Sequence, residues 1–550
     1  MARNLFIFGR TAALFVAAAV AVASVCAAGR TQAQITPRTD AITLDFGGTT
    51  LRPKRVISPW RAEVAAGSHR LVLTNRSVSE HDSKTDRARW TAIASEGYTL
   101  TWMASAGDIA YLSGANPDVK KPADRLLRLD LKTGSWLPNI PIKDTLIAVM
   151  PGSRSVCVLT ASLIDAPFPQ VKKMVSYQVI NYWEPGLEPM WQREFTAEPE
   201  AGHAEAYLLA AQTPIRANSN IQHLTKFSED VVVCAGARQA LIALNLKTGK
   251  TSWANGRIWE FQRGFVGPSV WSHFIARAGN QFDSGLELDA QKSKAFDEKY
   301  SCSIVAGPLV VVDTNENSRL SGEHLFVAVA RAEKGPYSTY LSDCVVYEID
   351  KYHRIVSTAK LPRMIDGSQR LALPNRLIWG CANNALVSLS PYEKEITDEP
   401  GSPDLTTFVS WYRQYVPYEN EAWLSSDADS SLAAFGPRAI YRLHAGGFDM
   451  LSTDNTYQFP ISKIDPLTGE ERTLILRVPF TGKLNLPRTN FSRITLGSVS
   501  YTHAMGTYEL AISQLTVDGP ILKVTLVSDK WSATVVFDMD DAGAGSSAGR

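Results

Sequence analysis

The stretch that decides the fold is Leu241-Ile242-Ala243-Leu244-Asn245-Leu246-Lys247-Thr248-Gly249-Lys250-Thr251-Ser252-Trp253. Its first residues form an alternating strand that ends at Asn245, whose side chain can cap a tight turn. Thr248 supports that turn, and Gly249 supplies the positive φ that the turn requires. The stretch therefore predicts a β-hairpin whose second strand carries Trp253.

The same unit recurs along the chain, which indicates a repeat architecture. A second copy, Leu126–Trp136, is shorter between glycine and tryptophan, and a weaker copy, Phe459–Glu470, lacks the tryptophan. Degenerate copies occur at Val346–Lys351 and Ala385–Ser390. The residues expected to build the repeats are Asp130, Thr133, Gly134, Trp136, Asn245, Thr248, Gly249, Trp253, Asp465, Thr468 and Gly469.

Short β-branched or aromatic runs, separated by glycine, proline, asparagine and aspartate, indicate an all-β protein. These runs are Ile109–Leu112, Ser155–Leu159, Val231–Cys234, Ser303–Val312, Leu325–Ala330, Cys344–Ile349 and Thr473–Val478. Helical patterning is strongest in Ala204–Ala211 and Leu288–Tyr300, which we expect to be insertions between strands. Because glycine and proline occur throughout the chain rather than in one linker, we expect one continuous array of repeats without a domain boundary.

The repeat resembles that of the pyrroloquinoline-quinone-like (PQQ-like) β-propellers, with the pattern apolar-x-Ala-x-Asp-x-x-Thr-Gly-Lys-x-x-Trp. Leu241–Trp253 matches this pattern except that Asn245 replaces the aspartate. The resemblance implies a β-propeller of about seven or eight four-stranded blades with loop or short-helix insertions. In such a ring the tryptophan after the turn would lie as a wedge against the neighbouring blade. An ordinary hairpin turn in a sandwich fold is the alternative interpretation.

The spacing of the two best copies fits this blade size. Asp130 and Asn245 are 245 − 130 = 115 residues apart, which suits two blades of roughly 40–50 residues with insertions. The intermediate copy is then Tyr177–Trp191, in which Asn181 and Trp183 stand near the turn.

The N-terminus reads as a cleavable export signal. Arg3 and Arg10 precede the uncharged apolar run Thr11–Val25, and small residues suitable for cleavage lie between Ala28 and Gln34. We therefore expect a signal peptide at 1–33, the propeller at 34–541 and a disordered tail at 542–550, with a secreted or periplasmic location. A membrane anchor and a lipid anchor on Cys26 are the alternatives; no transmembrane segment is expected after cleavage.

Charge and cysteine content narrow the possible partners. The chain has 56 Lys and Arg against 55 Asp and Glu, so it lacks the basic surface that nucleic-acid binding requires. The five cysteines after the signal have no metal-binding or haem-attachment spacing, and their strand-like surroundings favour burial as small apolar residues. They are Cys157, Cys234, Cys302, Cys344 and Cys381; a bond between Cys302 and Cys344 is the alternative.

PQQ-like propellers include quinoprotein dehydrogenases, and the resemblance to these enzymes implies specific cofactor ligands. Many of them clamp the quinone between a tryptophan and a disulfide of adjacent cysteines, and bind calcium through Glu, Asn and Asp. This chain has no adjacent cysteines, and its nine histidines lack paired metal-ligand spacing. We therefore predict no cofactor and no metal site, with PQQ and calcium as the alternative.

The function predicted from these observations is non-catalytic binding. The expected partner is an envelope protein or polysaccharide that docks on a loop face of the propeller. The candidate interface is aromatic, and aromatic residues anchor many interfaces; it comprises Trp411, Tyr412, Tyr415, Tyr418 and Trp423. Two alternatives remain open: a dehydrogenase that uses PQQ and calcium on an alcohol or sugar, and a glycan-binding or glycan-cleaving propeller.

Overall fold

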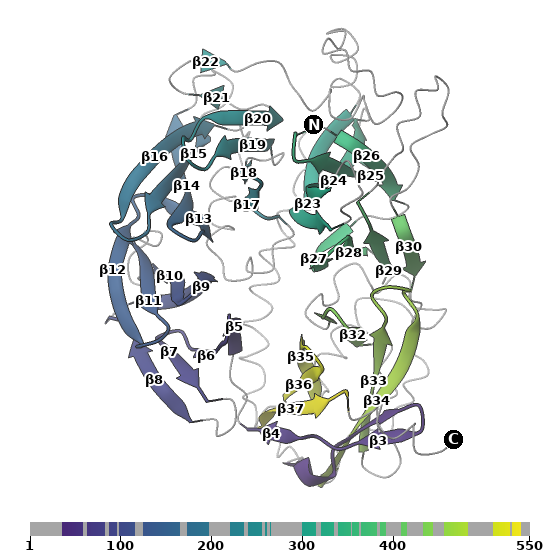
Figure 1. Cartoon of the computed structure of the whole chain (residues 1–550). Coiled ribbons are helices and arrows are strands. Elements are labelled where there is room, and N and C mark those ends of the chain that lie inside the picture. The colour runs from purple at the N-terminus through teal and green to yellow at the C-terminus, as the bar shows by residue number, and fades with distance from the viewer. Residues whose placement is uncertain are drawn as a thin grey trace, which may run out of the picture.

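Eight antiparallel sheets follow one another around a ring, with one strand of each beside the central axis (Figure 1). The computed structural model describes residues 36–58, 63–82, 87–95, 98–115, 125–165, 173–196, 221–235, 240–255, 259–260, 264–265, 300–314, 321–334, 339–353, 355–361, 365–381, 385–391, 409–414, 433–443, 456–481, 510–527 and 531–540. Each sheet is one blade of a β-propeller. The prediction of an all-β propeller with four-stranded blades is confirmed, and the blades number eight.

The first four blades run in chain order from the inner strand to the outer strand. Blade 1 contains β5 (Glu63–Ala66), β6 (His69–Leu73), β7 (Ser77–His81) and β8 (Ala88–Ile93). Blade 2 contains β9 (Thr99–Ala106), β10 (Ile109–Ala115), β11 (Arg125–Asp130) and β12 (Ser135–Pro141). Blade 3 contains β13 (Thr145–Pro151), β14 (Ser155–Asp165), β15 (Lys173–Trp183) and β16 (Glu188–Thr196). Blade 4 contains β17 (Leu224–Phe227), β18 (Asp230–Ala235), β19 (Ala240–Asn245) and β20 (Thr251–Asn255).

The remaining blades repeat this order, except that the last takes its outer strand from the N-terminus. Blade 5 contains β23 (Tyr300–Asp313), β24 (Gly322–Lys334), β25 (Thr339–Asp350) and β26 (Ile355–Leu361). Blade 6 contains β27 (Ile365–Leu373), β28 (Arg376–Cys381), β29 (Ala385–Leu389) and β30 (Val409–Gln414). Blade 7 contains β31 (Ala433–Phe435), β32 (Ile440–Leu443), β33 (Thr456–Ile464) and β34 (Glu471–Thr481). Blade 8 contains β35 (Ala511–Asp518), β36 (Ile521–Val527), β37 (Ser532–Asp538) and β4 (Arg55–Ile57).

The apolar core lies between the blades. On β34, Leu474, Leu476 and Val478 alternate with less buried residues, as expected for a strand that buries one face. These side chains pack together with Leu522 and Val524 of blade 8. Because each blade buries its apolar face against a neighbour, the ring is stabilised as a unit.

The N-terminal residues close the ring by joining the last two blades. The strands β1 (Thr36–Pro37), β2 (Thr43–Phe46) and β3 (Thr49–Leu51) extend blade 7, with a 3-10 turn, η1 (Thr39–Ala41), between the first two. β4 then pairs with β37 in blade 8 (Figure 1). We call residues 36–57 the strap. They precede blade 1 in the chain and pair with blades 7 and 8, the last two blades.

The intermediate copy expected between Asp130 and Asn245, Tyr177–Trp191, lies in β15 and β16 of blade 3. The expected strands fall within β10, β14, β18, β23, β24, β25 and β34. Of the expected helical insertions, residues 204–211 and 288–299 lie outside the described residues, and Tyr300 begins β23.

The cysteines whose side chains are described are buried, as the sequence interpretation predicts: Cys157, Cys234, Cys344 and Cys381. Burial raises the pKa of the Cys157 and Cys234 thiols above its ordinary value. Cys302 lies on β23 and Cys344 on β25, with β24 between them. Two strand spacings amount to about 10 Å, beyond the roughly 7 Å that a disulfide spans between Cα atoms. The alternative of a Cys302–Cys344 bond is therefore incompatible with this strand order.

We expect ring closure to be sensitive to acid. Glu63 of blade 1 forms an ion pair with Lys523 of blade 8 at 3.2 Å and another with Arg70, while Asp538 pairs with Lys54 of the strap. Burial raises the pKa of Glu63, but the hydrogen bond and charge of Arg70, together with the charge of Lys523, outweigh it and hold that pKa below its usual value. The hydrogen bond from Lys54 lowers the pKa of Asp538.

A carboxyl group whose pKa is lowered by folding stabilises the protein at any pH above its unfolded-state pKa, which is about 4 for these groups. This stability is lost as the pH falls through the folded-state pKa. Thermal melts followed by circular dichroism should therefore change little between about pH 7 and pH 5, and their midpoint should drop below about pH 4. A Glu63→Gln/Asp538→Asn variant should be less stable at neutral pH and show a smaller drop in acid. Identical pH profiles for both proteins would contradict this explanation.

Candidate functional site

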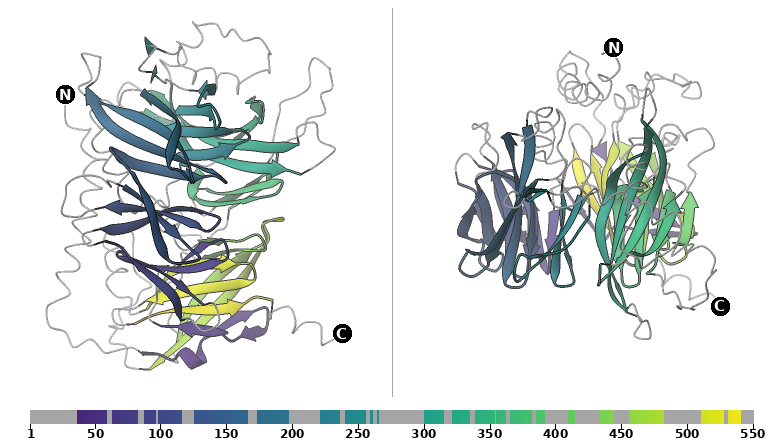
Figure 2. Two further views of the ribbon diagram at one scale, coloured as in Figure 1. Left: turned by 60° about the vertical axis from the view of Figure 1, so that its left-hand side comes forward. Right: turned by 90° about the horizontal axis from the view of Figure 1, so that it is seen from above.

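The propeller has two faces that carry different kinds of connection. Within a blade, the links between strands one and two and between strands three and four leave one face, because the strands are antiparallel. The links between strands two and three, and from each blade to the next, leave the other face. We call these the turn face and the connection face; Figure 2 shows the strands running between them.

The longest connections are anchored mainly at the connection face. Residues 197–223, 256–299, 415–432 and 482–510 each join the outer strand of one blade to the inner strand of the next. Another long segment, 390–408, starts from the turn face of blade 6. The chain also joins blades 2 and 3, and blades 5 and 6, through only three residues, 142–144 and 362–364. The geometry of the ring therefore does not require the longer connections.

One of these connections also pairs with a blade. Within residues 256–299, β21 (Trp259–Glu260) pairs with β22 (Gly264–Phe265), and Glu260 lies opposite Phe195 of β16. Phe195 is next to the last residue of its strand, at the connection face. This hairpin therefore adds two short strands to the outer edge of blade 3, at its connection-face end.

At the turn face, the three repeat copies form the same capped turn. The Oδ1 atom of Asp130 accepts hydrogen bonds from the backbone N–H groups of Lys132 and Thr133, at 2.8 and 3.3 Å. The Gly134 N–H donates to the Asp130 carbonyl oxygen at 2.8 Å. Asn245 and Asp465 cap their turns in the same way, and the glycines have φ values of 69°, 66° and 70° at Gly134, Gly249 and Gly469. The sequence unit thus encodes a turn with a fixed left-handed glycine.

A tryptophan from the preceding blade lies on each of these glycines. A Cβ atom on Gly249 would lie 2.7 Å from the Trp191 ring, and the Trp191 Nε1–H donates to the Leu246 carbonyl oxygen at 2.7 Å. Trp90 on Gly134 and Trp411 on Gly469 have equivalent positions, with Cβ approaches of 2.6 and 3.0 Å. The glycine therefore serves both the turn and a close aromatic contact between blades.

The tryptophans that follow the turns, Trp136 and Trp253, also contact neighbouring blades. Trp136 donates from Nε1 to the Ile93 carbonyl oxygen of blade 1, at 2.9 Å. Trp253 stacks on His353 of blade 5, with ring centroids 5.8 Å apart. His353 lies in the turn between β25 and β26 and has a positive φ, as the glycines of the other turns do. Trp183 is 46% exposed. The sequence reasoning missed the docking roles of Trp90, Trp191 and Trp411; the available signal was a tryptophan on the outer strand one blade before a Thr-Gly turn.

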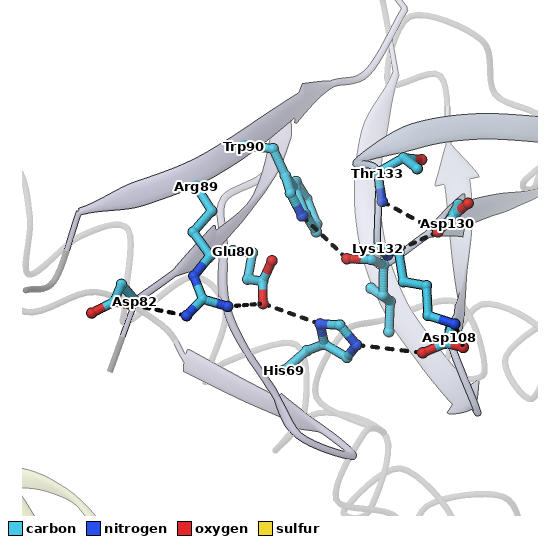
Figure 3. Close-up of polar contacts among 10 residues, drawn as sticks. His69, Glu80, Asp82, Arg89, Trp90, Asp108, Asp130, Lys132 and Thr133 are labelled. Carbon is cyan, nitrogen blue, oxygen red and sulfur yellow. Dashed lines mark hydrogen bonds and ion pairs between the residues drawn. The ribbon is translucent and has the colours of Figure 1, made fainter. Parts of the chain in front are cut away.

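A charged network crosses the junction of blades 1 and 2 beside Trp90 (Figure 3). His69 Nδ1 lies 3.1 Å from Glu80 Oε1, and His69 Nε2 lies 3.6 Å from Asp108 Oδ1 in blade 2. Lys132 pairs with Asp108 at 2.6 Å, and its hydrogen bond lowers the pKa of that carboxyl. Arg89 lies 3.4 Å from Glu80. Of these contacts only the one between His69 and Asp108 crosses the junction, so within this cluster it is the polar contact that joins the two blades.

The junction of blades 2 and 3 has a buried ion pair in place of a docked tryptophan. Arg128 pairs with Glu184 of the blade 3 turn, and the Tyr111 hydroxyl donates to the same carboxylate at 3.2 Å. Burial and the Glu184 charge raise the pKa of Tyr111. Removing either member of such a pair would leave an uncompensated buried charge.

Two histidine–carboxylate pairs are of a kind that many catalytic sites use; the first lies at the junction of blades 4 and 5, and the second lies within blade 5. His353 Nε2 lies 3.1 Å from Asp230 Oδ2, but its ring is packed between Trp253 and Phe227. His324 and Glu348 lie 2.7 Å apart, and both side chains are 0% exposed. Substrate therefore has no access to the second pair, and the first is part of the blade contact.

The candidate interface residues separate into two groups. Trp411 and Tyr412 lie on β30, where Trp411 contacts the Gly469 turn and Tyr412 packs against the core between blades 5 and 6. Tyr415, Tyr418 and Trp423 belong to the connection that follows β30 and lie outside the described residues. The role of this patch in binding stays a prediction.

The described residues contain neither a metal-binding cluster nor a membrane-spanning helix. No group of three or more His, Cys, Asp or Glu side chains in that part of the chain is arranged to hold a metal ion. Among the same residues, no helix has the length and apolar character needed to cross a membrane.

The fold and its turns define a β-propeller of eight blades. No family model matches the chain, and no curated protein matches it. Similar solved structures include BamB from Moraxella catarrhalis, which is 12% identical with a TM-score of 0.40, over 88% of this chain and 99% of that chain. The Saccharomyces cerevisiae protein Sqt1 is 10% identical with a TM-score of 0.38, over 88% and 98%. The computationally designed protein Ika8 is 9% identical with a TM-score of 0.36, over 81% and 94%.

Proposed function

We propose that this chain is an exported PQQ-like β-propeller that acts as a non-catalytic scaffold, and that it docks an envelope protein or polysaccharide on its connection face. The observation that carries the proposal is the anchoring of four long connections at that face, where three residues suffice elsewhere in the ring. Long loops on a rigid scaffold are the usual place for binding residues.

Assignment to the PQQ-like class is supported by the turns. Three copies of the sequence unit build the same capped turn, and a tryptophan of the preceding blade lies on each glycine. The arrangement therefore repeats in three dimensions as well as in sequence.

Export is supported by the position of the strap. The expected cleavage region ends at Gln34, and β1 begins at Thr36. Removal of residues 1–33 would therefore leave every strand of the strap intact. Secretion or periplasmic location is tested by cell fractionation of the full chain and of a chain that lacks residues 1–33; equal cytoplasmic retention of both would contradict it.

Docking on the connection face is tested by shortening one connection. Replacing residues 415–432 with Pro362-Arg363-Met364, the link that the chain uses between blades 5 and 6, removes Tyr415, Tyr418 and Trp423 and leaves Trp411 in place. We expect the variant to melt near the wild-type temperature and to lose most of its cosedimentation with isolated envelope fragments. Protease treatment of the fragments separates a protein partner from a polysaccharide.

The matched control for that test is Tyr352→Ser, because Tyr352 is 62% exposed on the turn face. It should cosediment like the wild type. Undiminished cosedimentation of the shortened variant would remove residues 415–432 from the binding surface. Uptake of PQQ with calcium, seen as a change in absorbance and a higher melting temperature, would favour the dehydrogenase alternative instead.

A further inference from the structure

Two side chains of blade 6 face the same side of their sheet beside the ring axis. Arg370 of the inner strand β27 lies directly opposite Trp379 of β28. Residues opposite each other in an antiparallel pair project from the same face, with Cβ atoms about 5 Å apart. Trp379 packs in the core shared with blade 5, so this face of the sheet is turned towards blade 5.

Both side chains bury a hydrogen-bond donor that has no acceptor. Nη1 of Arg370 and Nε1 of Trp379 are buried, and neither atom has a hydrogen-bond partner. Burial lowers the pKa of the Arg370 guanidinium, and no neighbouring charge acts against this effect. Arginine nevertheless keeps its charge in proteins, so this half-buried cation has its buried Nη1 end without a counter-charge among the described side chains. Buried polar groups are almost always paired, and each exception calls for an explanation.

The backbone of blade 5 next to this pair accepts no hydrogen bond from either donor. Gly307 lies beside the indole, since a Cβ atom on it would be 3.5 Å from Trp379 Cζ2. Its carbonyl oxygen already accepts from the Gln222 N–H at 2.9 Å, and the Pro308 carbonyl accepts from the Thr225 hydroxyl at 3.1 Å. Each of these two carbonyl oxygens accepts a hydrogen bond from blade 4 or the connection before it, and neither accepts one from Arg370 Nη1 or Trp379 Nε1.

Two other arginines at blade junctions have partners. Arg128 pairs with Glu184, and Arg376, on the strand next to Arg370, donates to Ser388 Oγ at 3.1 Å and to the Leu467 carbonyl at 2.9 Å. Arg128 also buries an Nε without a partner, but its Nη1 and Nη2 are paired, whereas Arg370 has a buried Nη1 that no acceptor reaches.

We propose that Arg370 and Trp379 form a binding site for a small oxyanion, a carboxylate or phosphate group, at the junction of blades 5 and 6. A guanidinium offers two parallel N–H groups to such a group, and the indole N–H supplies a further donor. A water molecule would accept one hydrogen bond but would bring no negative charge to the buried end of the guanidinium. The site is distinct from the connection-face loops, so its failure in a test would not affect the docking proposal.

The test is isothermal titration calorimetry of the mature protein with sodium phosphate and with sodium acetate, each at ionic strength matched by sodium chloride. We expect one of the two anions to bind with one site per chain. The anion that binds shows whether the site takes a phosphate or a carboxylate group. Arg370→Gln should weaken binding by about tenfold to a hundredfold, because a charge-assisted hydrogen bond contributes about 1.5–3 kcal/mol. Trp379→Phe keeps the aromatic ring and should weaken binding less.

Arg376→Gln is the matched control, because this arginine lies on the neighbouring strand and already has acceptors; its affinity for the anion should equal that of the wild type. A second readout is the change in tryptophan fluorescence on anion addition, which Trp379→Phe should reduce. Absence of binding of both anions to the wild type, or unchanged affinity in Arg370→Gln, would overturn the proposal.

Discussion

Deletion of the strap, residues 36–57, is expected to abolish the cooperative thermal unfolding of the mature protein. The strap supplies the outer strand of blade 8 and three further strands on blade 7. It also buries Ile42 and Leu44 completely, and Leu51 almost completely, in the core between these blades. Burial of such side chains contributes about 1.5–3 kcal/mol each, and a whole domain is stable by only about 5–15 kcal/mol.

The measurement is circular dichroism during heating, combined with size-exclusion chromatography. A shorter deletion, residues 36–51, removes the same three buried side chains but keeps β4, so the difference between the two deletions measures what the outer strand of blade 8 contributes. Deletion of residues 542–550, the expected tail, is the control and should leave the melt unchanged. A synthetic peptide of residues 36–57 added to the truncated chain should restore part of the transition. A truncated chain that melts within a few degrees of the wild type would show that the ring closes without the strap.

The strap illustrates what the sequence could not show. The capped turns depend on residues within six positions of each other, so Asp130 and Gly134 predict their turn directly. The pairing of Val56 with Val535 joins residues at opposite ends of the chain and leaves no local signal. The approximate blade number followed from chain length, whereas ring closure depends on strand order.

The candidate sites have the same limit. Trp411 belongs to an aromatic cluster that the sequence associates with an interface, but its contact with the Gly469 turn depends on the packing of one blade on the next. The opposition of Arg370 and Trp379 likewise depends on strand register, which includes an irregularity between Asp366 and Arg370. The long connections, by contrast, follow from the sequence once the blades are delimited.

The contact between Trp191 and Gly249 is expected to account for much of the stability of the junction of blades 3 and 4. Trp191→Ala removes a 9%-exposed ring and its hydrogen bond to the Leu246 carbonyl, which should destabilise the protein by about 3–5 kcal/mol. Gly249→Ala should cost about 1–2 kcal/mol for a left-handed residue and about 1–3 kcal/mol for overlap with the ring. Chemical denaturation followed by circular dichroism measures both changes.

Gly107→Ala separates these two causes, because Gly107 has a φ of 54° and nothing lies within 4 Å of its Cβ position. It should cost only the backbone part, about 1–2 kcal/mol. In a Trp191→Ala background, Gly249→Ala should cost no more than Gly107→Ala, since the ring that it would meet is absent. Equal effects of Gly249→Ala with and without Trp191 would show that the glycine is needed for its φ alone. A difference between the two backgrounds would measure directly how strongly the tryptophan couples one blade to the turn of the next.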